Sequence, residues 1–388
     1  MKSAKFKDSP LGPIPQDWEV KRLGEIAPLQ RGFDLPTKEL QEGPFPVVYS
    51  NGICNYHVEA MCDAPGLVTG RSGTIGHFTF IESGRYWPHN TALWVTSFKG
   101  NDPLYIKYLY ETLHFENFAT GSGVPTLNRN AIHEYEVALP SKIEEQQRIA
   151  EALGEVDKLI ESLDEQIEKK RLIAKGVAHD LLSAKKRLPG FKGEWKSVRL
   201  GELSEIVTGG TPSTEVPAFW GGDIRWMNSG DVHLKRIHDV DGRITQLGYA
   251  SSNARLIPIG SVVIALAGQG KTRGTAAITE CELCTNQSIG AILPSEKHDS
   301  ECLYYVLAMQ YEKLRAASSG DGTRGGLSKK ILEEYIVKLP VDIAEQQAIA
   351  DLLSEQDAAI AALEEKREKY ARIKDGMMRD MLTGKVRI

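Results

Sequence analysis

The sequence lacks several features that would place it in a specialised class of protein. Its 388 residues contain no run of about 18 apolar residues, the length that a membrane-spanning helix needs. The first 15 residues contain no apolar segment typical of secretory signals, so we expect no such signal. Basic side chains are not in excess, because 47 Lys and Arg stand against 52 Asp and Glu, giving a formal net charge of -5. A surface that is basic throughout is therefore excluded, whereas a local basic groove for nucleic acid is not.

Cysteine is also scarce, and the five cysteines do not predict a disulfide framework. Cys281 and Cys284 form a lone C-x-x-C, but no second Cys or His pair stands at the spacing of a structural zinc site. Cys54 and Cys62 are eight residues apart in another part of the chain. We expect these thiols to be buried or incidental in a protein of the reducing cytoplasm, with no bound metal or cofactor. A metal or redox role for them stays the alternative.

What the sequence does contain is an internal duplication. The motif Leu-Pro-x-x-Ile-x-Glu-Gln-Gln-x-Ile-Ala begins at Leu139 and recurs, 200 residues later, at Leu339. In that register, residues 139–183 share 20 identities in 45 positions with the second copy, without a gap. A second motif, Trp-x-x-x-Arg-Leu-Gly-Glu, begins at Trp18 and recurs at Trp195. Variable and constant segments therefore alternate as a variable domain (1–140), a constant segment (141–190), a variable domain (191–340) and a constant segment (341–388).

Each constant segment has the apolar spacing of a long helix in a coiled coil. In the first copy the apolar positions step by three and four: Leu153, Val156, Ile160, Leu163, Ile167, Ala174, Val177 and Leu181. The second copy has a weaker seam with Leu353, Ile360, Leu363, Tyr370, Met377 and Met381. A start near Pro140 fits a capping box formed by Ser141 and Glu144. We predict an antiparallel pair within one chain; separate surface helices or an intermolecular coil are the alternatives.

The variable segments have the short apolar runs, glycines and turn residues of small curved sheets. Runs such as 46–49, 67–69, 77–81 and 91–95 predict strands in the first segment, and 224–227, 261–265 and 288–292 predict strands in the second. Residues 103–118 and 301–317 are predicted to be helical. The predicted fold is therefore α+β: two α+β domains with curved sheets, two long helices, and an approximate two-fold axis from the duplication.

These motifs resemble the DNA specificity (S) subunit of type I restriction–modification systems, over nearly the whole chain. The resemblance is carried by the two Leu-Pro-x-x-Ile-x-Glu-Gln-Gln-x-Ile-Ala motifs, by Thr208–Ser213 with Phe219–Ile224, and by Tyr49–Ile53 with Trp87–Thr91. It implies a non-catalytic subunit whose two target-recognition domains each read one half of a split, asymmetric site in double-stranded DNA. It also implies that the helices set the spacing and dock two adenine methyltransferase subunits, which restriction subunits join. S-adenosylmethionine, ATP and Mg are then expected in those partner subunits.

Within this interpretation, polar and basic loop residues are candidates for DNA contact, although each could equally be a solvated surface residue or an ordinary turn. The candidates are Asn51, Arg71, Ser72, Asn128, Arg129, Asn228, Ser229, Gln269, Lys271, Arg273, Arg324, Lys329 and Lys330. Candidates for helix pairing or partner docking are Glu145, Gln146, Gln147, Leu153, Val156, Ile160, Leu163, Ile167, Glu345, Gln346, Gln347, Ile360, Leu363 and Tyr370.

Enzymatic interpretations find little support in the sequence. The run from Ala265 to Thr272 fits a loose nucleotide-binding loop, but it lacks the first glycine and precedes a predicted strand rather than a helix. No Pro-Pro pair is present for the Asn/Asp-Pro-Pro-Tyr loop of an adenine methyltransferase. The remaining rival is a duplicated coiled-coil scaffold or adaptor whose lobes bind proteins or glycans and have no role on DNA.

Overall fold

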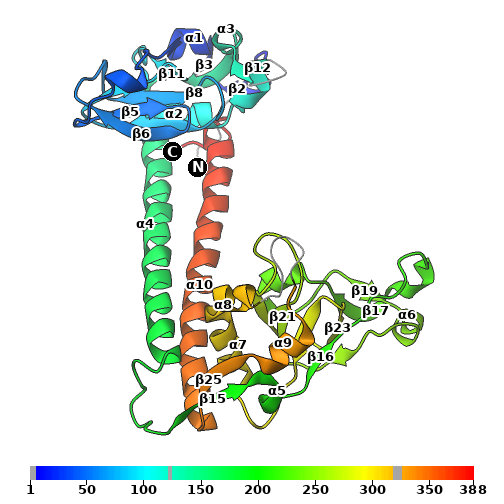
Figure 1. Cartoon of the computed structure of the whole chain (residues 1–388). Coiled ribbons are helices and arrows are strands. Elements are labelled where there is room, and N and C mark those ends of the chain that lie inside the picture. Colours follow the sequence, from blue (N-terminus) through cyan, green and yellow to red (C-terminus); the bar gives the residue numbers. More distant parts are fainter. Residues whose placement is uncertain (1–5, 121–124, 318–325) are drawn as a thin grey trace. The chain divides into compact units, whose positions relative to one another are not determined.

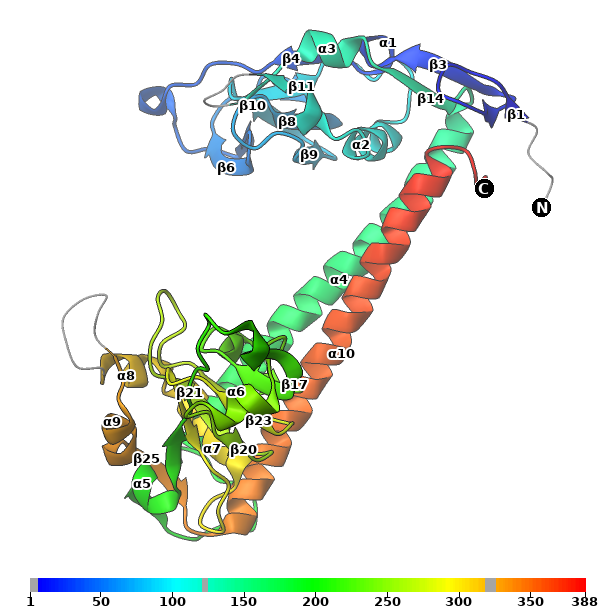
Figure 2. The ribbon, with the colours of Figure 1, turned by 90° about the vertical axis from the view of Figure 1, so that its right-hand side faces the viewer.

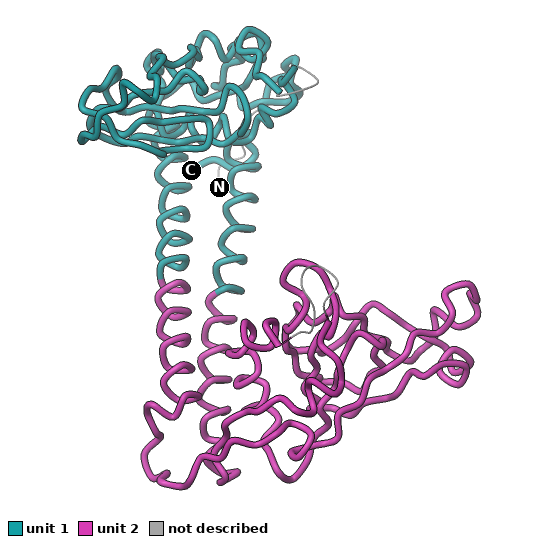
Figure 3. The backbone as a smooth tube through the Cα atoms, in the orientation of Figure 1, with its two compact units in different colours: residues 1–165, 364–388 teal, residues 166–363 magenta. Residues whose placement is uncertain are grey.

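The computed structural model describes residues 6–120, 125–317 and 326–388, and it confirms an α+β fold with two long antiparallel helices. The helices are α4 (Ile143–Leu182) and α10 (Ile343–Met381), which lie side by side in Figure 1 and, from a second direction, in Figure 2. The chain forms two compact units, 1–165 with 364–388 and 166–363, coloured separately in Figure 3. Each unit combines one α+β domain with part of both long helices.

The first unit contains two four-stranded sheets with the strand orders β6-β5-β10-β7 and β4-β11-β8-β9. Their strands are β4 (Leu29–Arg31), β5 (Phe45–Tyr49), β6 (Gly52–His57), β7 (Cys62–Asp63), β8 (Gly66–Gly70), β9 (Phe78–Ile81), β10 (Arg85–Pro88) and β11 (Ala92–Val95). Short helices α1 (Leu23–Ile26), α2 (Pro103–Glu111) and α3 (Arg129–His133) accompany them, and two-stranded ladders join β1 (Phe6–Lys7) to β2 (Ile14–Pro15) and β12 (Ala119–Thr120) to β13 (Thr126–Leu127).

The second unit repeats this plan with the strand orders β19-β17-β23-β20 and β16-β24-β21-β22-β18. Its strands are β16 (Ile206–Thr208), β17 (Trp220–Met227), β18 (Arg236–Ile237), β19 (Arg243–Ile244), β20 (Leu256–Ile257), β21 (Val262–Ala265), β22 (Ala276–Thr279), β23 (Leu283–Thr285) and β24 (Ile289–Ile292). The helices are α5 (Leu200–Leu203), α6 (Gln246–Ala250), α7 (Ser300–Met309), α8 (Tyr311–Ala316) and α9 (Lys329–Glu334). In each unit one four-stranded sheet contains a parallel pair, β5 with β10 and β17 with β23, and the five-stranded sheet of the second unit contains another, β18 with β22.

The structure explains why the two motifs of each repeat stand at opposite ends of a variable segment. Strand β3 (Trp18–Arg22) pairs antiparallel with β14 (Glu136–Pro140), so that Trp18 lies opposite Pro140. Strand β15 (Trp195–Arg199) pairs with β25 (Ile336–Pro340) in the same register. Each ladder closes its domain and leads directly into a long helix. The opening and closing motifs therefore recur together because they are structural neighbours.

The contacts between α4 and α10 show that the helices are antiparallel, because residue numbers rise along α10 as they fall along α4. In the first unit, Arg367 contacts Asp164 and Lys374 contacts Asp157, with N–O distances of 3.0 and 2.7 Å. Leu153, Leu163 and Ile167 of α4 are buried. Ser141, expected as a helix cap, instead donates its hydroxyl to the carbonyl of Asp17 at 2.7 Å, and α4 begins two residues later.

Candidate nucleic-acid interface

In the second unit the parallel strands bring three polar turns to one edge of the domain. Asn228 follows β17, and Asn286 follows β23, its parallel neighbour. The amide of Asn286 donates to the carbonyl of Met227 at 3.0 Å, and the amide of Leu266, which begins the next loop, donates to Ser288 at 2.8 Å. Since parallel strands end at the same edge, the turns that follow them lie close together. The candidates Asn228 and Ser229 therefore lie near the loop that carries Gln269 and Lys271.

The turn at Asn228 is internally ordered. The side-chain oxygen of Asn228 accepts from the amide of Gly230 at 2.7 Å, and the carboxylate of Asp231 accepts from the amide of Asn228 at 2.9 Å. Asn228 is exposed and Ser229 half-buried. A turn fixed by its own side chains presents its remaining polar groups in a defined geometry, as base recognition requires.

The loop of residues 266–275 is a hairpin between β21 and β22, and it opens a strand rather than a helix. The arrangement lacks the helix N-terminus with which a nucleotide-binding loop holds phosphate. Gly268, Gly270 and Gly274 have positive φ angles, and a guanidinium nitrogen of Arg315 on α8 donates to the carbonyl of Gly270. Gln269 and Lys271 are exposed in this loop, and Arg273 is half-buried.

A third candidate segment reaches the same loop. The amide of Leu327 donates to the carbonyl of Leu266 at 2.9 Å, and Ser328 caps α9 by accepting from the amide of Ile331. The next two residues, Lys329 and Lys330, form ion pairs one turn along the helix with Glu333 and Glu334. Both lysines are therefore partly neutralised. Arg324 lies outside the described residues.

The first unit gathers its candidates in the same way. The amide of Leu127 donates to the carbonyl of Arg71 at 2.8 Å, and Ser72 forms a β-bridge with Thr126, so the segment before α3 lies along the glycine-containing loop of residues 70–74. Asn128 caps α3, and Arg129 is exposed beside it. A Cβ at Gly70 would lie only 3.1 Å from the carbonyl oxygen of Ser50, which places the turn of Asn51 against the same loop. Arg71 and Ser72 are half-buried and Asn51 is exposed.

The Glu-Gln-Gln motifs form buried networks within each unit. The carboxylate of Glu145 accepts from both guanidinium arms of Arg387, at 2.8 and 2.6 Å, and from the indole of Trp18 at 3.3 Å. Asp17 binds Arg387 as well, and the guanidinium holds the pKa of Asp17 below its usual value. Gln146 donates to the carbonyl of Pro140 and accepts from the amide of Asp102.

The second unit repeats these contacts residue by residue. Glu345 accepts from Arg187 twice at 2.6 Å and from the indole of Trp195 at 3.4 Å, while Gln346 joins Pro340 to Asp299. The polar atoms of these Glu and first Gln residues are thus used inside the chain, whereas Gln147 and Gln347 are exposed. Arg187 and Arg387 were not among the candidates predicted from the sequence, although each repeat has an arginine at this position, 200 residues apart. Extending the repeat register past residue 183 would have found them.

The remaining helix candidates lie on α4 and α10, and all of them are buried or half-buried. Leu153, Leu163 and Ile167 are buried, and the others are half-buried: Val156, Ile160, Ile360, Leu363 and Tyr370. Each domain is also fixed to a long helix by a tyrosine. Tyr108 donates to Asp157 and Tyr305 donates to Asp357, both at 2.8 Å. Burial opposes ionisation of Asp157, but the Lys374 and Tyr108 hydrogen bonds outweigh it and lower its pKa.

The cysteines of the C-x-x-C are buried free thiols. Cys281 and Cys284 lie in or beside β23, and burial raises the pKa of Cys284 to about 11. In the part of the chain that the structure describes, no three His, Cys, Asp or Glu side chains are grouped as metal ligands. Nor is any described helix both long and apolar enough to cross a membrane.

Comparison with known proteins decides the family. The profile of the type I restriction modification DNA specificity domain matches residues 15–170 and again 192–372. The chain belongs to this family. As a specificity subunit, it is the non-catalytic component of a type I restriction–modification complex and recognises the target DNA sequence. The family resemblance drawn from the sequence is thereby confirmed, and the scaffold hypothesis is replaced.

Relatives of this specificity subunit match over its full length or over part of it. The type I restriction enzyme MjaVIII specificity subunit of Methanocaldococcus jannaschii is 24% identical over 417 residues, covering 100% of this chain and 97% of that protein. The EcoR124I/EcoR124II specificity subunit of Escherichia coli is 27% identical over 175 residues, 44% of this chain and 43% of that protein. The crystal structure of an S subunit from M. genitalium has the same fold, with a TM-score of 0.69, 16% identity and 98% of each chain covered.

Proposed function

We propose that each α+β domain of this specificity subunit reads one half of a split, asymmetric site in double-stranded DNA. The proposal is supported by one observation: both domains have a similar arrangement of strands, and polar turns lie at the corresponding edge of each domain. The side chains in those turns differ between the two domains. Asn51, Arg71 and Asn128 occupy the edge in the first domain, and Asn228 and Lys271 occupy it in the second. Two different readers in one chain recognise a non-palindromic site, which a symmetric homodimer could not do.

The long helices act in this proposal as a spacer. Helix α4 is a continuous helix of 40 residues, which at 1.5 Å per residue is about 60 Å long. A stiff helical pair of fixed length selects half-sites at one separation, of the order of one DNA turn or about 34 Å, and leaves the bases between them unread.

The helices also dock two adenine methyltransferase subunits, and restriction subunits join that complex. Leu172 and Ile173 on α4 are 70% and 53% exposed, and the exposed Gln147 adds hydrogen-bonding groups on the same helix. Apolar side chains exposed on a helix favour contact with another protein. S-adenosylmethionine would bind the methyltransferase subunits, and ATP and Mg the restriction subunits. The assembled complex works in the cytoplasm.

The partner subunits must supply much of the attraction to phosphate. Residues 24–140 contain seven basic and twelve acidic side chains, and residues 201–340 contain fourteen and sixteen. Domains with these charges gain little from counterion release. We therefore expect the isolated chain to bind DNA weakly and the complex with methyltransferase subunits to bind it tightly.

Salt-dependent binding tests the placement of the interface. Replacing Arg71 or Lys271 by Ala in the methyltransferase complex should weaken binding to the cognate duplex. The slope of log K against log salt should fall by about 0.9 for each phosphate that the variant no longer neutralises. Lys338→Ala, on β25, serves as the charge-matched control. Wild-type affinity and slope in both loop variants would remove these loops from the interface.

A further inference from the structure

Lys235 has a backbone conformation that lysine rarely adopts. Its φ is 62° and its ψ is -53°, near the γ-turn with positive φ, which is strained for any residue with a Cβ. Such a conformation persists only where surrounding contacts impose it, and it occurs preferentially at functional sites. His114, by comparison, has a φ of 46° and a ψ of 60°, which is the ordinary left-handed region.

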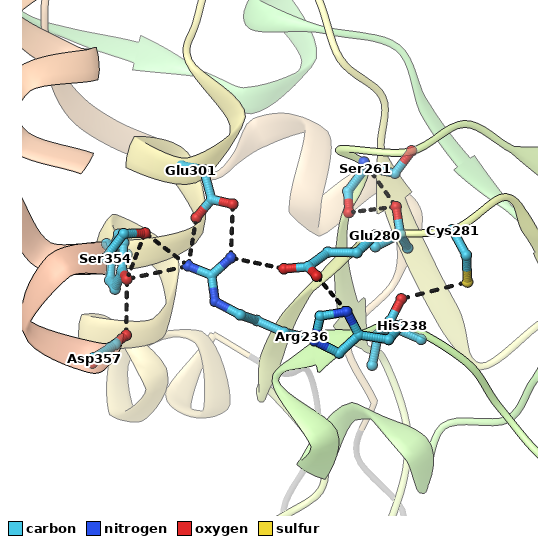
Figure 4. A network of polar contacts seen from close by, with 11 residues as sticks. Arg236, His238, Ser261, Glu280, Cys281, Glu301, Ser354 and Asp357 are labelled. Atoms are coloured by element: carbon cyan, nitrogen blue, oxygen red, sulfur yellow. Dashed lines mark hydrogen bonds and ion pairs between the residues drawn. The ribbon is translucent and has the colours of Figure 1, made fainter. Parts of the chain in front are cut away.

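Arg236, the next residue, provides those contacts. Its two guanidinium arms bind both carboxylate oxygens of Glu301 on α7 at 2.8 Å, and one arm binds Glu280 at 3.0 Å. The same side chain reaches Ser354 on α10 at 3.0 Å, as Figure 4 shows. Ser354 also contacts the hydroxyl of Tyr305, which donates to Asp357. The Glu301 carboxylate, together with these other partners, raises the pKa of Arg236 against the cost of burial. A charged, multiply bonded side chain thus fixes the strand that follows Lys235.

This anchor acts on a very short strand. Strand β18 has two residues and lies at the edge of its sheet, beyond β22. The first unit's corresponding sheet ends, among the described strands, at β9. Two residues of ladder could not hold a strained backbone alone. The hydrogen bond from the amide of Ile278 to the carbonyl of Lys235, at 2.8 Å, ties Lys235 to the neighbouring strand.

The strained residue lies where two candidate DNA loops meet. Strands β18 and β22 are parallel, so the turn that enters β18 and the glycine-rich loop that enters β22 lie at the same edge of the sheet. Lys235 is exposed, and within the described part of the chain its ammonium forms no ion pair. Leu234, 45% exposed, and His233 stand beside it. An uncompensated cation is thus held at the edge that carries Lys271.

We propose that Lys235 binds a phosphate of the DNA backbone and that Arg236 is the positioning residue that holds it in its strained conformation. The inference rests on the proposed DNA-reading role of the second domain, and it adds a contact on the 228–235 turn. The strain is kept because relaxing the backbone would turn the lysine side chain away from the phosphate. Folding stability and DNA binding therefore oppose each other at this residue.

That opposition gives the test, made on the chain assembled with its methyltransferase subunits and its cognate duplex. Lys235→Gly should raise the thermal midpoint of the chain by about 2–4 °C, because glycine accepts the backbone angles. It should also lower affinity about eightfold at 0.1 M salt and reduce the salt slope by about 0.9. Lys235→Gln should lower affinity similarly without raising the midpoint, and Lys235→Arg should keep wild-type affinity.

Two matched controls separate strain from charge. Ala184→Gly relieves a positive φ of 59° after α4 and should raise stability with no effect on binding. Lys338→Gln removes an exposed charge from β25 and should change neither the stability of the chain nor its binding to DNA. If the wild-type complex prefers its cognate duplex but Lys235→Gln retains affinity and slope, the inference is wrong and the proposed function stands. A wild-type complex without that preference refutes the proposed function and the inference with it.

Discussion

The two arginine–glutamate networks predict a large and symmetrical loss of stability. Arg387→Ala would leave Glu145, whose side chain is 4% exposed, with the indole of Trp18 as its one remaining side-chain partner among the described residues. Arg187→Ala would leave Glu345, 1% exposed, in the same state. Removing one partner of a buried ion pair costs about 3–5 kcal/mol. Both arginines are about 30% exposed, so water can reach part of each site, and we expect a loss of about 2–3 kcal/mol for each variant.

The assay is urea unfolding followed by linear extrapolation, with probes in each of the two compact units so that their transitions are followed separately. Arg387→Ala should shift the transition of the first unit, and Arg187→Ala that of the second. Adding Glu145→Gln to Arg387→Ala should recover much of the loss, since no charge is then buried alone. The stability of Arg387→Lys should lie between those of the wild type and Arg387→Ala, because one ammonium group cannot replace the two-armed contact of a guanidinium. Changes within about 0.5 kcal/mol of wild type for both Ala variants would refute the reasoning.

Two further predictions concern pH and helix length. Burial lowers the pKa of His298 to about 4, so as the pH falls below 6.5 this histidine takes up a proton in the unfolded chain before it does so in the folded chain. The free energy of unfolding should therefore drop by about 2 kcal/mol between pH 7 and pH 5. Urea unfolding measured at each pH should show this drop in the wild type and not in His298→Phe. A drop of the same size in the variant would assign the effect to other groups. Inserting one heptad into each of α4 and α10 keeps the seam in register and lengthens the pair by about 10 Å, so the spacer between methylated half-sites should grow by about three base pairs. An unchanged spacer with active enzyme would refute the spacer role.

Much of the architecture could be predicted because the duplication and the heptads are local or periodic signals. The antiparallel pairing follows from two similar helices in one chain, and the structure confirms it through Arg367 with Asp164 and Lys374 with Asp157. The sequence domains end at the helix boundaries, whereas the compact units divide both helices near residues 165 and 364. That division follows from side-chain packing between elements distant in sequence, which periodicity does not encode.

The sequence predicted which types of residue form the candidate site, but it did not predict how they are arranged in space. Asparagines and cations in glycine-rich turns suggested Asn51, Arg71, Asn228 and Lys271, but only the parallel strands show that such turns share an edge. The strain at Lys235 had no signal in the sequence, because lysine is a poor predictor of positive φ. Its conformation depends on contacts from three other elements.

The most direct test of the proposed function is a map of methylated adenines in cells with and without this chain, expressed with its methyltransferase partner. A DNA-reading subunit with two different domains predicts a motif of two unlike halves separated by a fixed number of unread bases, present only when the chain is present. Exchanging one variable domain for that of a relative should change one half of the motif and leave the other half and the spacer unchanged. A continuous or palindromic motif, or a map that does not depend on the chain, would contradict the account.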